Sequence, residues 1–339
     1  MLNTKNVLFA AIVLFAFAAA GSGQWQKQTI DTTAGFRGLS VVSEKVIWAS
    51  GTGGTFIRTI DSGKTWKVGK VPDADRLDFR DIEAFDANTA YVLSIGNGDT
   101  SRIYKTTDGG ETWKLQFKNT NEKAFFDAIA CWDASNCIAM SDPVDSRYVL
   151  ISTKDGGANW KPLDTSKMPA AIEGEAAFAA SGTCVTVNGK SDVFIVTGGR
   201  AARVFRSNDR GLSWSVADTS IVKGADGTGI FSIAFRNALH STIVGGNYEK
   251  PSEAANSLAF TRDGGKTWYA GEGLGGFRSG VAYIDDKTLI AVGSSGSDIS
   301  FDRGAVWKNL DKLSYNAVQA KGKKAVWAVG DKGMVAKFQ

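Results

Sequence analysis

One eight-residue pattern, Ser/Thr-x-Asp-x-Gly-x-x-Trp, occurs six times along the 339-residue chain. The copies begin at Thr59, Thr106, Thr153, Ser207, Thr261 and Ser300, and their aspartates are Asp61, Asp108, Asp155, Asp209, Asp263 and Asp302. Four fixed positions kept in six copies, at intervals of 39 to 54 residues, are typical of a repeat fold. The pattern therefore predicts one small structural unit built again and again.

The residue types suggest why the pattern is kept. An aspartate carboxylate can accept backbone N–H groups of its own turn, and glycine supplies a positive φ. The tryptophan then opens the next strand and can pack its large apolar surface between neighbouring sheets. We assign the six aspartates to folding; the alternative is that six acidic turns bind calcium or a substrate.

Short apolar runs surround each copy of the pattern. In the first unit they span residues 37–41, 46–50 and 55–58, and a fourth run starts at Trp66. Four antiparallel strands per repeat are typical of a β-propeller blade. The chain is thus expected to be all-β.

The count of units predicts how the ring closes. Three further strands, at 315–320, 325–329 and 334–338, follow the last copy of the pattern, and a fourth is missing there. Trp25-Gln26-Lys27 matches the Trp-Lys that follows several copies, so the N-terminal segment should complete the last blade. We predict a single seven-bladed propeller domain over residues 24–339, closed by its N-terminal strand, with two otherwise open sheet edges paired.

The N-terminus has the features of a signal peptide. Lys5 precedes an uncharged apolar run at 7–20, and small residues follow, so residues 1–23 are predicted to be removed. An uncleaved anchor is the alternative, but 14 residues fall short of the roughly 20 that span a bilayer. We expect a secreted or periplasmic protein with no stable membrane span after cleavage.

Three cysteines fit an exported protein. Cys131 and Cys137 flank a turn-like segment between two apolar runs, and a disulfide there would join a hairpin. Two unpaired small hydrophobic residues are the alternative. Cys184, in a strand-like run, is expected to be a buried free thiol.

Composition argues against several functional classes. The net charge of +4 is spread along the chain, with no like-charge run that would favour nucleic acid. The single histidine, His240, leaves little material for a Ser-His-Asp triad or a histidine zinc site. We expect a monomer with no metal and no cofactor.

The repeats, together with Phe36-Arg37-Gly38-Leu39-Ser40-Val41 and the run at 46–51, resemble the BNR/Asp-box superfamily. Within it, the chain is most similar to bacterial photosystem II stability/assembly-factor-like proteins. The superfamily also holds sialidases and other glycosidases, so the resemblance implies a propeller fold and leaves activity open. Gly38-Leu39 follows Arg37 where the sialidase arginine motif has Ile-Pro, which argues against a sialidase.

Strand order places the six boxes on one rim and the longer insertions on the other. The insertions include 141–148, 197–203 and 245–257, and such elaboration of one face suggests binding there, although neutral loop drift would give the same pattern. The innermost strands start on this rim at 37–38, 80–81, 126–127, 174–175, 231–232, 278–279 and 315–316. The resulting ligand-binding candidates are Arg37, Arg80, Arg278, Asn316, Tyr248 and Arg203, and the catalytic candidates are Asp81, Asp127 and Glu175.

Two functional hypotheses follow. The first is a non-enzymatic propeller that binds a protein or glycan partner on the elaborated rim. The second is a glycosidase-like hydrolase or lyase at the channel mouth, because arginine forks suit carboxylates and paired carboxylates suit glycoside chemistry. A polar lining around channel water is the structural alternative to both.

Overall fold

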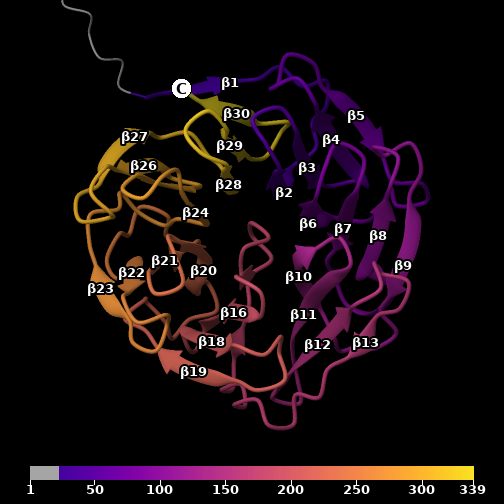
Figure 1. The fold of residues 1–339 in the computed structure, drawn as a ribbon. Coiled ribbons are helices and arrows are strands. Elements are labelled where there is room, and N and C mark those ends of the chain that lie inside the picture. Colours follow the sequence, from indigo (N-terminus) through magenta and orange to yellow (C-terminus); the bar gives the residue numbers. More distant parts are fainter. Residues whose placement is uncertain (1–22) are drawn as a thin grey trace, which may run out of the picture.

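Seven β-sheets surround one axis in the computed structural model, which describes residues 23–339 (Figure 1). Each sheet has an inner strand near the axis and an outer strand at the circumference, as the prediction of four antiparallel strands per repeat implied. The predicted signal peptide falls almost entirely on residues 1–22, outside the described residues. No helix in the described part of the chain is long and apolar enough to cross a bilayer.

Blades 1 to 3 follow the chain in order. Blade 1 holds β2 (Phe36–Val41), β3 (Ile47–Gly51), β4 (Thr55–Thr59) and β5 (Lys67–Lys70). Blade 2 holds β6 (Phe79–Ala84), β7 (Ala90–Ser94), the 3-10 turn η1 (Gly98–Thr100), β8 (Arg102–Thr106) and β9 (Lys114–Lys118). Blade 3 holds β10 (Phe126–Asp133), β11 (Asn136–Val144), β12 (Arg147–Thr153) and β13 (Lys161–Pro162).

Blades 4 and 5 share an irregularity. Blade 4 holds β15 (Val185–Asn188), β16 (Asp192–Val196), β18 (Arg203–Ser207) and β19 (Ser215–Asp218). Blade 5 holds β20 (Thr228–Phe235), β21 (Ser241–Asn247), β22 (Leu258–Thr261) and β23 (Tyr269–Gly271). The short strands β14 (Glu175–Ala176) and β17 (Gly198–Gly199) pair with each other and join β20, so the blade 5 sheet has six strands.

The last two blades complete the ring. Blade 6 holds β24 (Gly280–Tyr283), β25 (Leu289–Gly293), β26 (Gly296–Ser300) and β27 (Lys308–Asp311). Blade 7 holds β28 (Ala317–Ala320), β29 (Val326–Val329), β30 (Val335–Phe338) and, from the other end of the chain, β1 (Trp25–Lys27).

The closing strand is held by both backbone and side chain. Trp25 pairs with Phe338 in antiparallel register, and their rings meet edge to face with centroids 5.2 Å apart. The Trp25 indole N–H also donates to Ser297 Oγ of blade 6 at 3.0 Å. Circular closure by the N-terminal strand is confirmed.

The box turns show how the repeated aspartate works. In the first box, Asp61 accepts hydrogen bonds from Thr59 Oγ1, from the Thr65 backbone N–H and from Thr65 Oγ1. These bonds, the Thr65 hydroxyl foremost, lower the pKa of Asp61 to about 2. Gly63 has φ +85°, a conformation that favours glycine. The carboxylate is therefore occupied by its own turn.

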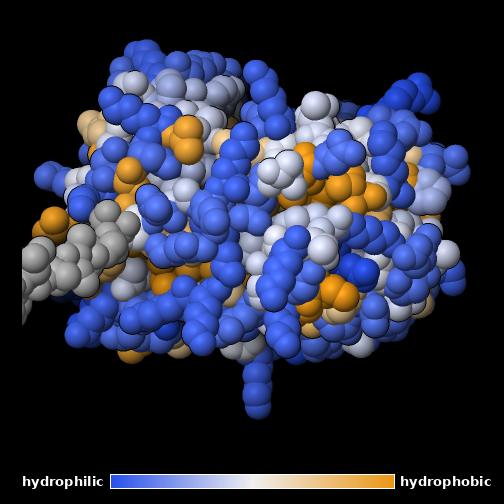
Figure 2. Space-filling model, turned by 90° about the horizontal axis from the view of Figure 1, so that it is seen from above, coloured by the Kyte–Doolittle hydropathy of each residue, from blue (hydrophilic) through white to orange (hydrophobic). Residues whose placement is uncertain are grey.

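Core packing fills the spaces between blades. Trp48 and Phe56 of blade 1 face the next blade, and Trp113 packs against both, with centroids 6.5 and 5.2 Å away. The outer wall around β1 is covered mostly by hydrophilic side chains, with small separate apolar patches (Figure 2). Large apolar side chains are thus buried between the sheets, as expected for a repeat fold.

The cysteines lie in blades 3 and 4. Cys131 and Cys137, paired across β10 and β11, form a disulfide. Cys184 is buried and carries no disulfide.

Candidate functional site

The rim opposite the boxes carries a pocket at the mouth of the central channel. It has a volume of about 470 Å³ and collects residues from blades 1, 2, 5, 6 and 7 and from the β14–β15 connection. Its lining residues are Arg37, Arg80, Phe178, Ala179, Ala180, Phe231, Tyr248, Phe277, Ser279, Ser294, Ser314, Tyr315, Asn316 and Asp331. We call this the mouth pocket.

One wall of the mouth pocket comes from a segment that crosses the centre of the ring. Residues 177–183, here the central segment, connect β14 to β15 and project toward the axis (Figure 1). Phe178 stacks on Phe231 of blade 5 at 3.9 Å between centroids, and the Ala177 N–H donates to Asp142 of blade 3 at 2.7 Å. The central segment therefore spans the channel mouth and is fixed by blades on two sides.

Two arginines meet the central segment from the other side. Arg37 Nη1 donates to the Ala180 carbonyl at 3.4 Å, and Arg80 Nη1 donates to the Ala179 carbonyl at 3.3 Å. Arg80 also pairs with Asp78, with 2.7 Å between Nε and Oδ2. Within residues 23–339, Arg37 makes no ion pair. Burial, then the neighbouring Arg80 charge, lowers the pKa of Arg37, while the more distant carboxylates of Asp331 and Asp78 act in the opposite direction.

An aromatic wall faces these arginines. Phe277 meets Phe231 edge to face at 4.7 Å, and Tyr248, half exposed, lies 6.2 Å from Phe231. The sequence analysis singled out Tyr248 but missed Phe178, Phe231 and Phe277. Phe231 was visible as the start of an inner strand, whereas nothing in the sequence indicated that the central segment would bring Phe178 against it.

Asn316 lines the mouth pocket, and its side-chain amide links two blades. Its Nδ2 donates to the Phe36 carbonyl at 3.0 Å and to Asp331 Oδ1 at 2.9 Å, across blades 7 and 1. Asp331 is the sole carboxylate among the lining residues. The pocket thus combines two arginines, one engaged aspartate and several rings.

The predicted catalytic aspartates lie beneath this pocket and are buried. Asp81 and Asp127 are 3% and 1% exposed. Asp81 accepts the N–H groups of Ile82 and Ile129, both at 2.8 Å, and burial raises its pKa to about 8. Burial, then Asp142, raises the pKa of Asp127, whose Oδ2 has no hydrogen-bond partner. Among the described residues, no group of three or more His, Cys, Asp or Glu side chains is arranged to hold a metal ion.

The placement of Glu175 requires a correction. The sequence analysis put Glu175 at the start of an innermost strand, but it lies in β14, paired with Gly199 of β17. Its buried carboxylate accepts Arg203 Nε at 3.0 Å and pairs with Arg203 Nη2. The inner strand of blade 4 begins ten residues later, at Val185, because the central segment is inserted between them. Glu175 and Arg203 therefore form a buried ion pair that holds this insertion.

Arg278 is also removed from the channel lining. The side chain is fully buried, with Nε 2.7 Å from Asp298 Oδ2 and Nη1 bonded to the Phe277 carbonyl and Ser295 Oγ. Its guanidinium holds the β25–β26 turn. Of the three predicted arginines, the structure brings Arg37 and Arg80 together and separates Arg278 from them.

These positions give no support to hydrolysis. An inverting or retaining glycosidase needs two carboxyl groups that reach the substrate from either side of the scissile bond. Asp81 and Asp127 are enclosed, and Glu175 is neutralised by Arg203. The mouth pocket instead presents two arginines and an aromatic wall.

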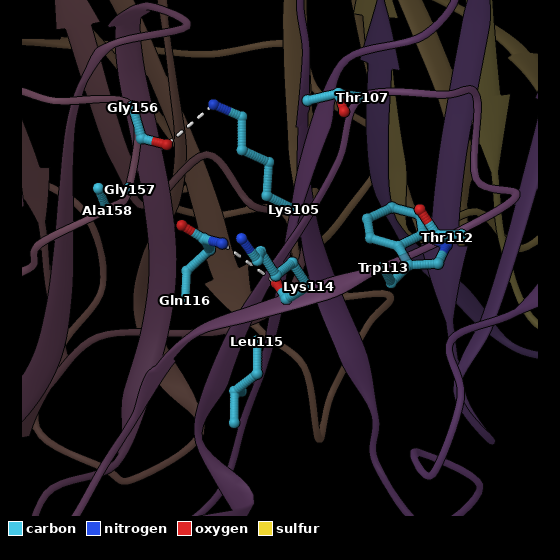
Figure 3. Close-up of a pocket in the computed structure, with 10 residues that line it drawn as sticks. All are labelled: Lys105, Thr107, Thr112, Trp113, Lys114, Leu115, Gln116, Gly156, Gly157 and Ala158. Carbon is cyan, nitrogen blue, oxygen red and sulfur yellow. Dashed lines mark hydrogen bonds between the residues drawn. The ribbon is translucent and has the colours of Figure 1, made fainter.

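A larger groove, of about 700 Å³, lies between blades 2 and 3 beside the box turns. Figure 3 shows Lys105 reaching across it to the Gly156 carbonyl, with 2.8 Å between Nζ and the oxygen, and Gln116 beside Lys114. Its lining residues include no carboxylate. The groove lacks the convergent groups that mark the mouth pocket.

Comparison with known proteins supports the repeat and the fold. The model of the BNR/Asp-box repeat matches residues 104–115, which contain the second box. No curated protein matches the sequence.

Three solved structures show the same architecture. YCF48 bound to a D1 peptide is 16% identical, with a TM-score of 0.68 over 93% of this chain and 96% of that chain. YCF48 from Cyanidioschyzon merolae is 18% identical, with a TM-score of 0.69 over 93% and 99%. The GH74 enzyme of Niastella koreensis is 14% identical, with a TM-score of 0.61 over 92% of this chain and 53% of that enzyme. At these identities the likeness concerns the fold.

Proposed function

We propose that this BNR/Asp-box propeller, structurally similar to the photosystem II assembly factor YCF48, binds an extended segment of a protein partner in its mouth pocket. The observation that carries the proposal is the junction of Arg37 and Arg80 with the Phe231–Phe277–Tyr248 wall in one pocket. The structural relative that holds a D1 peptide supports a peptide over a glycan.

The chemistry of the pocket suggests what the segment carries. Arg37 makes no ion pair within residues 23–339 and lies beside Arg80, so a carboxylate, from an acidic side chain or a chain terminus, would form charge-assisted hydrogen bonds with it. The aromatic wall offers apolar surface to a neighbouring side chain, and exposed tyrosine is frequent at protein interfaces. We infer recognition of an acidic residue next to an apolar one.

Export is a separate part of the proposal. The apolar run at 7–20 supports it, and a disulfide between Cys131 and Cys137 is typical of oxidising compartments. Fractionation of the host cell, with N-terminal sequencing of the mature protein, tests it. Recovery of the full-length chain from the cytoplasm would contradict export.

Selection from a displayed random-peptide library tests the binding function. The wild-type protein should enrich peptides that combine acidic with aromatic or aliphatic residues. Arg37→Glu should weaken binding of the selected peptides by about 10- to 100-fold, since a hydrogen bond to a charged group contributes about 1.5–3 kcal/mol.

A charge-matched control separates the pocket from general electrostatics. Arg262→Glu makes the same change on the box rim, and it should leave peptide binding unaltered. Absence of any enriched sequence, or equal loss in both variants, would remove the mouth pocket as the binding site.

A further inference from the structure

Four of the seven interfaces between successive blades are closed by a stacked pair. An aromatic ring from the second strand faces the next blade, and a cation from the third strand lies over that ring. The pairs are Trp48 with Arg58, Tyr91 with Lys105, Phe194 with Arg206, and Trp327 with Lys337, at 4.8 to 5.7 Å between charge and ring centroid. The ring fills the space between blades and the cation covers it.

The interface between blades 5 and 6 is built differently. Strand register pairs Thr242 with Phe260, as it pairs Trp48 with Arg58 in blade 1. A threonine therefore stands where blades 1, 2, 4 and 7 have a large ring and blades 3 and 6 have an isoleucine. Its hydroxyl lies 2.9 Å from the hydroxyl of Tyr283, across the interface.

A cavity of about 310 Å³ lies at this interface, beside the last box. The residues that line it are His240, Ser241, Thr242, Phe260, Thr261, Arg262, Tyr283, Asp302, Arg303, Gly304 and Ala305. The size is at the lower end of small-molecule sites. We call it the blade 5/6 cavity.

The last box presents a free acceptor at this cavity. In the five other boxes, the side chain four residues after the aspartate donates to its Oδ2 at 2.5 to 2.8 Å; the donors are Thr65, Thr112, Asn159, Ser213 and Thr267. In the sixth box that residue is Val306, whose side chain has no hydrogen-bond donor. Within residues 23–339, Asp302 Oδ2 accepts no hydrogen bond, whereas Oδ1 accepts from Ser300 Oγ and the Val306 N–H.

Donors and an aromatic surface face the same space. Arg262 lies over the Phe260 ring at 5.1 Å, and Arg303 lies beside it on the box turn with φ +68°. The residue after the aspartate has a positive φ in all six boxes, so this conformation belongs to the box turn itself. Asp286 pairs with Arg303 at 2.9 Å, so two carboxylates offset the arginines around the cavity.

We propose that the blade 5/6 cavity binds a neutral hexose unit of a glycan. A sugar hydroxyl would donate to Asp302 Oδ2, another would accept from Arg262, and C–H groups of the sugar would contact the part of Phe260 that lines the cavity. The hydroxyls of Thr242 and Tyr283 lie at the back of the cavity. An anionic ligand would meet the carboxylates of Asp302 and Asp286, so a neutral saccharide is the better fit. This site lies on the rim opposite the mouth pocket and is independent of peptide binding.

Calorimetric titration with maltohexaose, cellohexaose, laminarihexaose and mannohexaose tests the proposal, with hexagalacturonate as the acidic counterpart. At least one neutral hexasaccharide should bind at millimolar concentration or below. Phe260→Ala should weaken that binding by about tenfold through loss of the apolar contact. Thr242→Trp should abolish it by filling the cavity as blade 1 does.

Val306→Thr is the sharpest variant, because it preserves the fold. It supplies Asp302 with the hydroxyl donor that the other boxes have, so it should weaken sugar binding about tenfold while circular dichroism and the melting temperature show a folded protein. Lys105→Ala, in the corresponding groove between blades 2 and 3, should leave binding unchanged. The proposal is overturned if no neutral hexasaccharide binds, if only hexagalacturonate binds, or if Thr242→Trp and Val306→Thr bind as the wild type does.

Discussion

Aspartates occupy two contrasting regions of this propeller, the box turns on one rim and the channel beneath the other. The box aspartate Asp61 is held by hydroxyl and N–H donors that lower its pKa to about 2. The channel aspartate Asp81 is enclosed, and burial raises its pKa to about 8. The same side chain is therefore kept charged where its turn supplies donors, and tends to the neutral form where the core excludes water.

The contrast shows that a repeated aspartate is stabilised in its charged form by its own turn, whereas a buried aspartate depends on the particular position it occupies. A box recurs because its carboxylate satisfies a turn wherever that turn is placed. Asp81 and Asp127 belong to single positions, where they meet the central segment and one another's strands. Their energetic effects should accordingly differ in sign as pH changes.

Asp209→Ala tests the box aspartates and carries the largest expected effect. The substitution removes acceptors for Ser207 Oγ, Leu212 N–H and both donors of Ser213, and it should lower the free energy of unfolding by about 2–4 kcal/mol. Urea denaturation measures the change. Asp226→Ala, at an exposed loop position, is the matched control and should stay within about 0.5 kcal/mol. Equal effects of the two substitutions would show that box aspartates do not stabilise the fold.

The pH dependence of stability sharpens the contrast. Asp142 and Asp81 have folded-state pKa values of about 6 and about 8, above the unfolded value near 3.8, so the folded chain holds protons that the unfolded chain releases. Their stabilising contribution is complete below pH 4 and is lost as the pH rises through 6 and 8. Box aspartates such as Asp61, with lowered pKa values, lose their contribution at low pH instead.

Stability should therefore pass through a maximum near pH 4. Between pH 5 and pH 8 we expect the free energy of unfolding to fall by about 1–2 kcal/mol, given about 1.4 kcal/mol per pKa unit for each group and partial compensation by water. Denaturation midpoints at successive pH values measure the fall. A free energy of unfolding that rises steadily from pH 5 to pH 8 would contradict the prediction that Asp142 and Asp81 are protonated in the folded chain.

Asp127→Asn isolates one channel carboxyl. Because Asp127 Oδ2 lacks a partner and its pKa is raised by burial, the amide should stabilise the protein at pH 8 by about 1 kcal/mol and have little effect at pH 5. The measurement is the same denaturation series. Destabilisation at both pH 5 and pH 8 would mean that the negative charge of Asp127 stabilises the fold.

Val306→Thr gives the smallest expected effect and extends the comparison to the one incomplete box. A threonine here would donate to Asp302 Oδ2 as Thr65 does to Asp61, and it should raise the melting temperature by about 1–2 °C. Scanning calorimetry detects such a shift. A lower melting temperature would show that Val306 contributes more by packing than a hydroxyl would by bonding.

Much of the fold was predictable because the box pattern is local. Asp61, Gly63 and Trp66 act within one turn and its adjoining strand, so their spacing indicates structure directly, and the blade count followed from it. Closure through Trp25 was predictable for the same reason, since a missing strand at one end had its match at the other.

The candidate site was less predictable because it depends on an insertion. Aligning inner strands placed Arg37, Arg80, Asp81 and Asp127 correctly on strands near the axis, but it mistook Glu175 for a channel residue. The apolar run after Glu175 looks like a strand, while in the fold it forms the central segment. Pairing of Arg203 with Glu175 and of Arg278 with Asp298 spans 20 to 28 residues, a separation at which sequence spacing gives no geometric signal.

Closure by β1 has a consequence for the order in which the molecule is made. Strand β1 has no partner until β30 has been synthesised, because Gln24 and Gln339 bond to each other and Trp25 lies against Phe338. The ring therefore locks only after β30 has been synthesised, and a circular permutant with new ends in a turn between blades, and residues 24 and 339 joined, should remove that delay.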